Sequence, residues 1–224
     1  MTQQLETMFR LQEQLNDDTN GPTWREGWTR QGKRINWRRC IVMETAELID
    51  SFPWKHWKGI AGDLDRENIR IEMVDIWHFV MSLVLMRHDP REGAALAAAC
   101  FVDQEARLPA AWSPREDARL DGLLAPYERL MALALEGESV EALLEAFWRA
   151  LGWSGMDLEA LYRLYIGKNA LNQFRQKHGY KEGRYRKIWQ GREDNAVMQA
   201  VLEEEPAIGY DALMERLERL YREA

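Results

Sequence analysis

The stretch NIRIEMVDIWHFVMS, residues 68–82, sets two acids into a helical pattern that is apolar on nearly every side. Glu72 and Asp75 are three residues apart, so a helix places both carboxylates on one face. Isoleucine, valine, methionine and aromatic residues fill most other positions, which predicts a helix that is mostly buried. A carboxylate in such surroundings is costly unless a cation or strong hydrogen-bond donors accompany it. The stretch therefore predicts a buried helix that carries a charged site.

A second acid pair stands upstream in CIVMETAELIDS, residues 40–51, where Glu44 and Glu47 have the same spacing inside another apolar pattern. The likeness of the two stretches suggests two helices that present equivalent faces to one site. Four converging carboxylates repel one another and do not all ionise without a counter-charge. If that charge is a metal, ligation by oxygen alone favours Mg²⁺ or Mn²⁺ over zinc. The alternative is that each acid pairs with an arginine on a solvated face.

The rest of the chain is predicted to be helical as well. Its 224 residues are 46% hydrophobic and 30% charged, with only 15 glycines and 7 prolines. This composition favours helices, and no stretch alternates apolar and polar residues in a way that demands a strand. The sequence therefore predicts an all-α, multi-helix bundle of roughly eight helices. The expected helices span residues 3–18, 37–52, 65–88, 127–136, 139–151, 157–178, 194–204 and 210–223.

We expect one catalytic domain over residues 1–224, because a chain of this length can bury a full-sized core. Residues 90–126 differ in character: they are alanine-rich and then interrupted by three prolines, the last of which is Pro126. Proline inside a helix removes a backbone hydrogen bond and clashes with the preceding turn. We therefore expect a connector here with room for one short helix, and a candidate mobile insertion over about residues 90–156.

Charge and hydropathy exclude several classes of function. No apolar run reaches the roughly 20 residues that a membrane-spanning helix needs, and the N-terminal MTQQLETMFR lacks the pattern of a signal peptide. Cys40 and Cys100 form neither a CxxC pair nor a disulfide framework, which suggests a reducing, cytoplasmic location. A net charge of −7 argues against direct nucleic-acid binding. Residues 175–192 nevertheless hold seven Lys and Arg against one Glu, a patch suited to a small polyanion.

A stripe of phosphate-binding donors is predicted on the helix at residues 157–178. Lys168, Asn172 and Arg175 fall at positions i, i+4 and i+7 of one helical face. Arginine can grip a phosphate with two donors, and lysine acts as a point charge. Taken alone, the pattern is more often a solvated basic face. Beside a metal site it gains meaning, because a metal and a cationic stripe together can clamp a polyphosphate.

A base-binding group is predicted from two further places in the chain. Gln12 and Asn16 are four residues apart, and their amides could read the edge of a nucleobase because each offers a donor and an acceptor. His56 and Trp57, which follow the first acid pair, could stack on a base. The alternative for a tryptophan is core packing, and most of the ten tryptophans must serve the core.

Five stretches together make the chain resemble a known family: LQEQLNDDTNGPTW, ETAELIDSFPWKHWK, NIRIEMVDIWHFVMS, GKNALNQFRQKHGYKEGRY and WQGREDN. They stand in the order in which the family has them. The sequence is similar to the dimeric, all-α dUTPases of the all-α nucleoside-triphosphate pyrophosphatase superfamily. The two acid pairs are shared by the whole superfamily, whereas the stretches around Gln12, Trp57 and Asn172 are more specific to the dUTPase branch. Residues 90–156 match no motif of the family.

The resemblance implies hydrolysis of dUTP to dUMP and pyrophosphate, with dUDP as a second substrate that yields dUMP and phosphate, which keeps uracil out of DNA. It implies two or more Mg²⁺ ions per site, with Mn²⁺ as a substitute, held by Glu44, Glu47, Glu72 and Asp75. Glu47 is the candidate general base, and water is expected to attack the β-phosphorus. The family also implies a homodimer in which helices of one subunit complete the base site of the other.

The same resemblance assigns substrate-binding residues. The positions that match the phosphate contacts of the family are Lys168, Asn172, Arg175, Tyr180, Lys187 and Asn195. The positions that match its uracil and sugar contacts are Gln12, Asn16 and Trp57, with His56 and Phe79 as weaker matches. His78, by contrast, is expected to be structural.

Two other functions are compatible with these residues. A relative with a different base choice, such as a dCTP/dUTP pyrophosphatase or a broader house-cleaning nucleotide hydrolase, would use the same acid pairs and differ around Gln12, Asn16 and Trp57. A regulatory protein could keep the scaffold without turnover, since phage-borne members of such families act on host repressors through protein contacts. A pure binding protein has no physical reason to keep four acids together inside apolar helices, so catalysis is the preferred interpretation.

Overall fold

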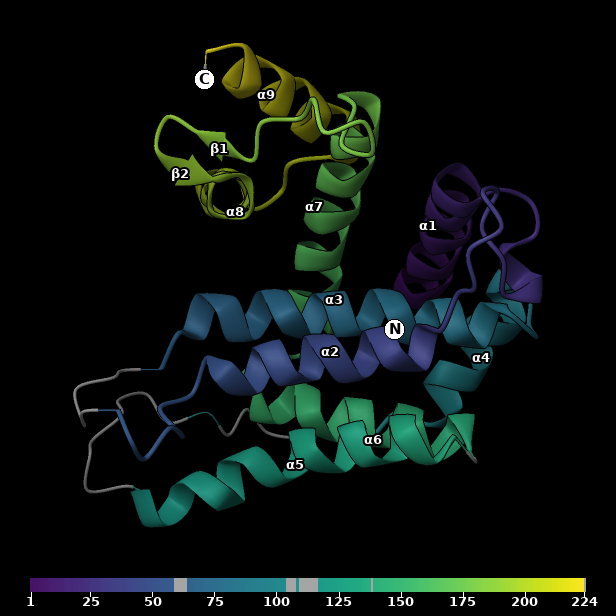
Figure 1. The fold of residues 1–224 in the computed structure, drawn as a ribbon, viewed down its shortest axis with the longest axis vertical. Helices are drawn as coiled ribbons and strands as arrows, with labels where there is room; N and C mark the ends of the chain where they lie inside the picture. The colour runs from purple at the N-terminus through teal and green to yellow at the C-terminus, as the bar shows by residue number, and fades with distance from the viewer. Residues whose placement is uncertain (59–63, 104–107, 109–116, 138, 224) are drawn as a thin grey trace.

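The computed structural model describes residues 1–58, 64–103, 108, 117–137 and 139–223, and within these ranges most of the chain is helical (Figure 1). The predicted all-α class is confirmed. The described ranges contain nine α-helices, one short 3₁₀ helix and one pair of two-residue strands. In chain order the elements are α1 (Thr2–Asn20), η1 (Trp24–Glu26), α2 (Trp37–Asp50), α3 (Arg66–Leu85), α4 (Pro90–Ala99), α5 (Asp117–Glu136), α6 (Val140–Trp153), α7 (Leu158–Lys177), β1 (Ile188–Trp189), β2 (Arg192–Glu193), α8 (Asp194–Glu204) and α9 (Tyr210–Arg222).

The two helices that carry the acid pairs begin at polar side chains. Asn36 accepts a hydrogen bond from the backbone N–H of Arg39 at 3.0 Å and so caps α2. Asp65 accepts one from the backbone N–H of Asn68 at 3.0 Å and caps α3. These caps satisfy backbone N–H groups that the first turn of a helix leaves without a partner. The first turn of each helix is thereby defined, and with it the position of each acid along the helix.

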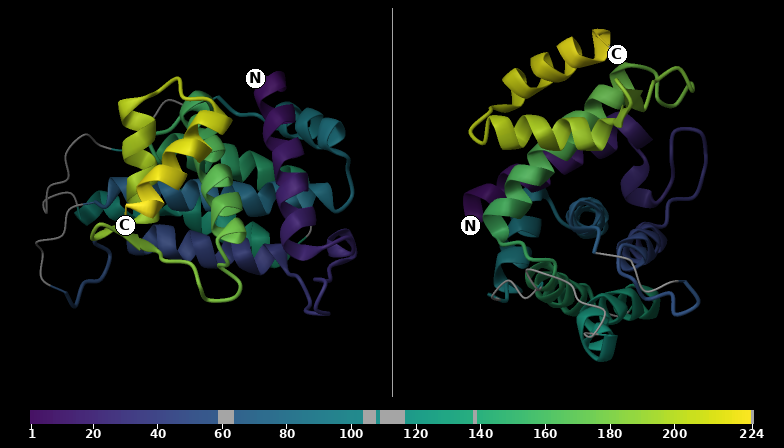
Figure 2. Two further views of the ribbon diagram at one scale, coloured as in Figure 1. Left: turned by 90° about the horizontal axis from the view of Figure 1, so that it is seen from above. Right: turned by 90° about the vertical axis from the view of Figure 1, so that its left-hand side faces the viewer.

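The helices form two groups (Figures 1 and 2). In the first group α2 packs against α3 and α5, and α5 packs against α6. In the second group α1 and α7 pack against each other, and α8 and α9 pack against the part of α7 that extends away from α3. Contacts of α3 with both α1 and α7 join the two groups. The acid-bearing helix α3 therefore lies where the two groups of helices meet.

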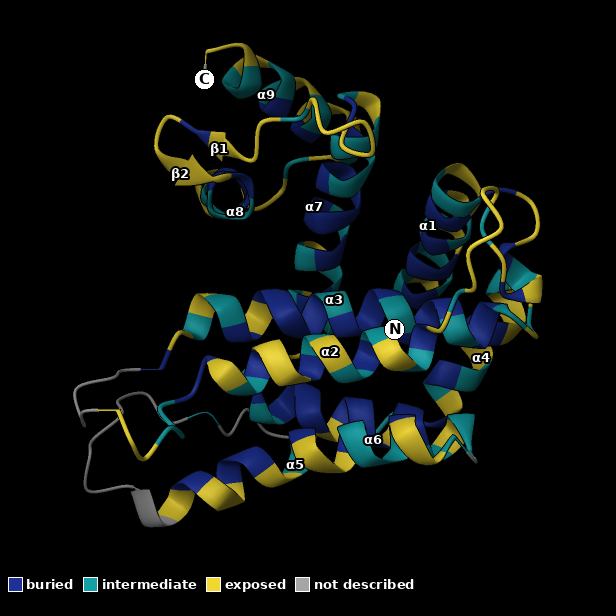
Figure 3. Cartoon of the chain, viewed as in Figure 1, coloured by how far each residue is buried: buried dark blue, intermediate teal, exposed yellow. Residues whose placement is uncertain are grey.

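The predicted burial of the stretch at residues 68–82 is confirmed. Figure 3 shows α3 buried along most of its length, and even the carboxylate-bearing Glu72 is only 7% exposed. Trp77 is fully buried, with its ring stacked on that of Phe147 in α6 at a centroid distance of 4.6 Å. In the described ranges no helix is long and apolar enough to cross a membrane.

The segment at residues 90–126 is more helical than predicted. It contains all of α4 and the first half of α5, where only one short helix was expected. With α6 it forms part of the main hydrophobic core, since Trp148 of α6 packs 5.0 Å from Trp77 and donates a hydrogen bond to the carbonyl of Ala97 in α4 at 3.0 Å. The predicted connector at 104–107 and 109–116 lies outside the described residues.

Helix α5 begins at Asp117, well before the predicted start at 127, and continues through Pro126. The apolar residues on both sides of the proline are buried, namely Leu123, Leu124, Tyr127 and Leu130. Each such side chain contributes about 1.5–3 kcal/mol on burial, and together they outweigh the cost of about 3 kcal/mol for proline inside a helix. Proline chemistry was given too much weight in that prediction.

The C-terminal elements surround a second hydrophobic cluster built on α7. The ring of Phe174 lies 5.6 Å from that of the buried Trp189, and α8 and α9 add their apolar faces. Gly167 permits the close approach of α8 to α7: a Cβ at this position would lie 2.6 Å from Leu202 Cδ1 and 2.6 Å from Met198 Sδ. The absence of a side chain at residue 167 therefore sets the spacing between α7 and α8.

The expectation of no strand is wrong at one place in the described chain. β1 pairs with β2 in antiparallel register, with Ile188 opposite Glu193 and Trp189 opposite Arg192. The turn between them passes through Gln190 and Gly191, whose φ angles of 49° and 79° are typical of a two-residue hairpin. Strands of two residues are too short to leave an alternating pattern in the sequence.

Candidate active site

The two acid pairs meet because α2 packs against α3. Glu44, Glu72 and Asp75 each place one carboxylate oxygen within 4.8 Å of the others, an arrangement that could hold a metal ion. Burial, then the charge of Asp75, raises the pKa of both Glu44 and Glu72. The raised pKa values mean that negative charge at this cluster is poorly compensated by the protein. A set of oxygen ligands with uncompensated charge fits Mg²⁺.

Glu47 lies nearly one turn further along α2 and is exposed. It is outside the group of three converging carboxylates, but its charge acts on Glu44 and Glu72 and contributes to their raised pKa values. The predicted set of four acids is thus divided into three that converge and one at the rim. A carboxylate at the rim of such a cluster is accessible to water, and this is what a general base requires.

A buried lysine from α7 reaches the acid cluster. Lys168 Nζ lies 2.7 Å from Asp75 Oδ2 and donates a hydrogen bond to Asn195 Oδ1 at 3.1 Å. The lysine is 3% exposed, so water screens this ion pair little. Its positive charge also lowers the pKa of Glu72, in opposition to the acids around it. Lys168 therefore connects the predicted metal end of the site with the predicted phosphate end.

Arg175 is held by a carboxylate from the start of α8. Its Nε and one Nη each donate to a different oxygen of Asp194, both at 2.8 Å, and Nη1 donates to Asn172 Oδ1 at 3.3 Å. Burial alone would lower the pKa of Arg175, but the hydrogen bonds and charge of Asp194 outweigh it and raise the pKa. The bidentate pair fixes the plane of the guanidinium.

Asp194 is fully buried, and its carboxylate accepts hydrogen bonds from three residues. Besides Arg175 it accepts from the hydroxyl of Tyr185 at 2.7 Å and from the backbone N–H of Asn195 at 2.9 Å. Burial raises the pKa of Asp194, but Arg175 outweighs it, so the pKa stays below its ordinary value. Asn195 was predicted as a site residue, whereas Asp194 was not. The available signal was an acid directly before a predicted phosphate contact and two residues after the basic segment 175–192.

A pocket of about 280 Å³ lies between α1, α3 and α7 beside these groups, with Trp37 of α2 at its wall. The structure brings seven predicted site residues to this pocket: Gln12, Asn16, Asp75, Phe79, Asn172, Arg175 and Tyr180. The predicted base end and phosphate end therefore share one cavity, next to the acid cluster.

Two aromatic residues form one wall of the pocket. Phe79, a predicted site residue, is stacked on Trp37, which was not predicted, with ring centroids 5.9 Å apart and an interplanar angle of 25°. Trp37 is the first residue of α2 and is 8% exposed. Its position directly after the capping Asn36 gave no sign of a ligand contact, because helix starts of this kind occur throughout folded proteins.

Five predicted substrate-binding residues do not line the pocket. Two of them, Lys168 and Asn195, contact the pocket-lining Asp75 and Arg175 instead, and the other three are exposed. Trp57 is 62% exposed and contacts Trp54 and His56 at ring distances of 5.5 Å and 5.0 Å. His56 is exposed as well. Lys187 is exposed and lies 3.7 Å from Glu193 in an ion pair. The structure therefore leaves the aromatic-basic segment after α2 outside the cavity.

The predicted base-reading amides are joined in a buried network. Gln12 Nε2 donates to Asn16 Oδ1 at 3.2 Å and to Ser82 Oγ at 3.0 Å. Gln12 Oε1 lies 2.6 Å from His78 Nδ1 and accepts from Tyr165 Oη at 3.2 Å. Burial lowers the pKa of His78 to about 4, so its imidazole is neutral at physiological pH. His78 was expected to be structural, but it lines the pocket.

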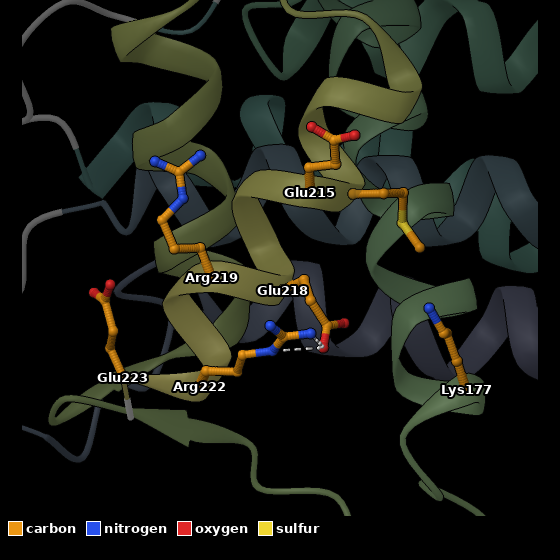
Figure 4. Close-up of a pocket in the computed structure, with 7 residues that line it drawn as sticks. Lys177, Glu215, Glu218, Arg219, Arg222 and Glu223 are labelled. Atoms are coloured by element: carbon orange, nitrogen blue, oxygen red, sulfur yellow. Dashed lines mark hydrogen bonds and ion pairs between the residues drawn. The ribbon is translucent and has the colours of Figure 1, made fainter.

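A second pocket, of about 500 Å³, lies between α7 and α9 (Figure 4). It is lined by three basic and three acidic residues together with Met214, and two of these, Glu218 and Arg222, form an ion pair at 3.2 Å. It contains none of the predicted site residues. Because its charges are balanced locally, it does not favour a ligand of either sign.

One comparison with known proteins bears on this arrangement. The family model described as dUTPase matches residues 4–180, which is more than half of the chain. The match includes both acid pairs, the amides of α1 and the whole of α7. No curated protein matches the chain. The chain belongs to the all-α dUTPases, and is accordingly a dUTP diphosphatase, an enzyme that hydrolyses dUTP.

Proposed function

We propose that this dUTP diphosphatase depends on Mg²⁺ and converts both dUTP and dUDP to dUMP, releasing pyrophosphate or phosphate. The observation that carries the proposal is the convergence of Glu44, Glu72 and Asp75 within 4.8 Å, next to a pocket lined by Arg175 and Asn172. The acids suit a hard cation, and the donors on α7 suit phosphate oxygens. A metal and cations on opposite sides of a polyphosphate are the arrangement that stabilises charge during its hydrolysis.

Glu44, Glu72 and Asp75, with Glu47 at the rim, would hold the ions, two or more per site, and Mn²⁺ could replace Mg²⁺. When bound, Mg²⁺ offsets the charge on phosphate oxygens and lowers the pKa of water. The raised pKa values of Glu44 and Glu72 support this assignment, because a cation would remove the repulsion that causes them.

Glu47 is proposed as the general base. It is exposed at the edge of the acid cluster, so a carboxylate oxygen can accept a proton from the attacking water without displacing a buried group. The water would attack the β-phosphorus, with dUMP as the leaving group. Attack at this atom explains why dUDP, which lacks the γ-phosphate, would give the same nucleotide product.

The residues of α7 and the segment after it would bind the phosphates. Asp194, Asn172 and Asn195 together engage four of the five N–H groups of Arg175, so among the described contacts one N–H on Nη1 is left for a ligand. The other proposed contacts are Lys168, Asn172, Tyr180, Lys187 and Asn195. Lys187 is outside the pocket, so it would have to turn toward the ligand from its ion pair with Glu193.

Gln12, Asn16 and Phe79 would bind the base and sugar from the pocket wall. Trp57 and His56 would add to the base site only if the segment that follows α2 approaches the cavity, since Trp57 is now 62% exposed. We also propose a single catalytic domain over residues 1–224, a homodimer and a cytoplasmic location. A dCTP/dUTP pyrophosphatase activity and a regulatory protein contact are the alternatives.

The test is a product analysis with dUTP, dUDP, dCTP, dTTP and UTP, each with Mg²⁺, with Mn²⁺ or with EDTA. Glu47→Gln removes the proposed base, and Glu67→Gln, an exposed acid in the first turn of α3, is the matched control. We expect dUMP from dUTP and dUDP alone, with loss of turnover in EDTA and in Glu47→Gln. Turnover that persists in EDTA would refute the metal dependence. Equal hydrolysis of dCTP would favour the broader enzyme, and light scattering would report the oligomeric state.

A further inference from the structure

We propose that Ser82 makes the enzyme choose uracil over cytosine by fixing the orientation of the Gln12 and Asn16 amides. The inference rests on the proposed base site, in which these amides face the nucleobase. Ser82 lies on α3, is fully buried and does not line the pocket, so it is a positioning residue and not a ligand contact.

The single proton of the Ser82 hydroxyl is committed to the backbone. Ser82 Oγ donates to the carbonyl of His78 at 2.7 Å, whereas its other acceptor in reach, Asn16 Oδ1, is 3.4 Å away. A carbonyl can only accept, so the shorter bond leaves Ser82 Oγ with lone pairs alone for its other neighbours. Gln12 Nε2 and Asn16 Nδ2 both lie 3.0 Å from Ser82 Oγ. Both positions must therefore be amide nitrogens and cannot be amide oxygens.

The other neighbours of Gln12 do not impose this choice. A neutral imidazole can present either an N–H or a lone pair at Nδ1, depending on its tautomer, so His78 could face either end of the Gln12 amide. The hydroxyl of Tyr165, 3.2 Å from Gln12 Oε1, can likewise donate or accept. A reversed Gln12 amide would keep partners at both residues. It would lose its bonds to Ser82 and to Asn16 Oδ1, and the Asn16 amide is itself oriented by Ser82.

The orientation of Asn16 decides what the pocket offers to a base. With Nδ2 fixed toward Ser82 and Oδ1 toward Gln12, Asn16 has one further N–H and one further lone pair in fixed places. Uracil presents an N–H flanked by two carbonyls, whereas cytosine presents a lone pair at that nitrogen beside an amino group. An amide of fixed orientation that matches one pattern opposes the other, and a buried mismatch of this kind is costly.

The experiment compares kcat/KM for dUTP with kcat/KM for dCTP. In Ser82→Ala and Ser82→Cys, which remove the acceptor or replace it with a poor one, we expect the dUTP/dCTP ratio to fall by roughly 10-fold to 100-fold. Ser82→Thr should retain the ratio, because a threonine hydroxyl can make the same bond. The buried Thr45 in α2 donates to the carbonyl four residues earlier, that of Ile41, at 2.6 Å. Ser154→Ala is the control, since that buried hydroxyl bonds the carbonyl of Leu151 and, in the part of the chain that the structure describes, no amide of the base site.

Binding of dUMP and dCMP, measured by calorimetry without metal, gives a readout that does not need turnover. The same fall in base preference is expected there for Ser82→Ala and Ser82→Cys. A ratio within about twofold of wild type in both variants, or an equal loss for both bases, would overturn the inference. If the unaltered protein fails to hydrolyse dUTP with Mg²⁺, the proposed function fails instead, and the two binding constants still decide the role of Ser82.

Discussion

The two ends of the site differ in how far their polar and charged groups already have partners within the protein. At the predicted base end, Gln12 and Asn16 both donate hydrogen bonds to Ser82, and Gln12 is also bonded to His78. Each donor there faces an acceptor. At the acid cluster, burial and the charge of Asp75 raise the pKa values of Glu44 and Glu72, and for Glu72 a hydrogen bond from Glu44 and the charge of Lys168 oppose this rise without cancelling it. The comparison shows that the amide network is completed within the fold, whereas the charge of the acid cluster is not balanced.

The phosphate end lies between these extremes. Arg175 is paired with Asp194 and is therefore oriented in advance, and its Nη1 and Nη2 also donate to Asn172 and Asn195. Orienting a cation in this way lowers the entropy that a ligand must overcome on binding. The site thus combines three features: a completed amide network, an oriented cation and an acid cluster whose charge is not compensated.

The largest effect should follow from neutralising one acid of the cluster. Glu72→Gln keeps the shape of the side chain but removes the charge of a proposed metal ligand, so we expect kcat/KM for dUTP to fall by about 1,000-fold or more at saturating Mg²⁺. The measurement is steady-state release of dUMP, with Glu67→Gln as the control that retains activity. A loss smaller than about tenfold would mean that the remaining acids, Glu44, Glu47 and Asp75, suffice, and the comparison between the two ends would break down.

The next largest effect should follow from removing the carboxylate that orients Arg175. Asp194→Ala leaves Arg175, whose side chain is 12% exposed, without its partner, and an uncompensated charge at such a site costs about 3–5 kcal/mol. We expect the free energy of unfolding, measured with urea, to fall by about that amount, and KM for dUTP to rise. Glu193→Ala changes the neighbouring exposed acid and should cost less than about 0.5 kcal/mol. Equal stability of the two variants would show that Arg175 is not held by Asp194.

The smallest effect concerns the stability of the metal-free protein as a function of pH. The pKa values of Glu44 and Glu72 are raised to about 8 and about 7, so the folded protein binds protons more tightly there than the unfolded chain does. Stability is therefore lost as pH rises through these values. We expect the Tm in EDTA to fall between pH 6.5 and pH 8.5, and Mg²⁺ to reverse the fall.

Glu44→Gln should make the metal-free protein more stable at pH 8.5, by roughly 2–6 °C, and less responsive to Mg²⁺. Differential scanning calorimetry in EDTA and in Mg²⁺ provides the measurement. A Tm in EDTA that is flat with pH in the unaltered protein, or a variant that follows it, would show that the acids do not repel one another. The same variant should be inactive, so stability and activity would move in opposite directions.

Much of the fold could be predicted because amphipathic helices leave a strong pattern. The helix expected at 3–18 is found at Thr2–Asn20, and that expected at 157–178 is found at Leu158–Lys177. The start of α5 was missed because the proline rule is local, whereas the burial of Tyr127 and its neighbours that overrides it depends on other helices. The acids of α2 and α3 could be assigned to one site because the two acids of each pair are three residues apart in both helices.

The positioning residues of the site could not be found in this way. Ser82 bonds Asn16 and Gln12, which are 66 and 70 residues away along the chain, and Asp194 bonds Arg175, which is 19 residues away. A lone serine or aspartate has no pattern that reveals such a partner. Trp37 was missed for the same reason, since its contact with Phe79 exists only after α2 packs against α3. Spacing within one helix is visible in a sequence, and contacts between helices are not.

A substitution at Gly167, which has no side chain to offer a ligand, would disturb the proposed phosphate end of the site. Gly167 precedes Lys168, and its missing side chain admits Met198 and Leu202 of the helix whose first residues are Asp194 and Asn195. A methyl group at position 167 would push that helix outward and draw the carboxylate away from Arg175. In a mutational scan the position would thus show the intolerance of an active-site residue, although its own atoms bind nothing. Homologues that carry a larger residue there would need smaller ones at 198 and 202, and such paired changes would trace the coupling of α8 to the site.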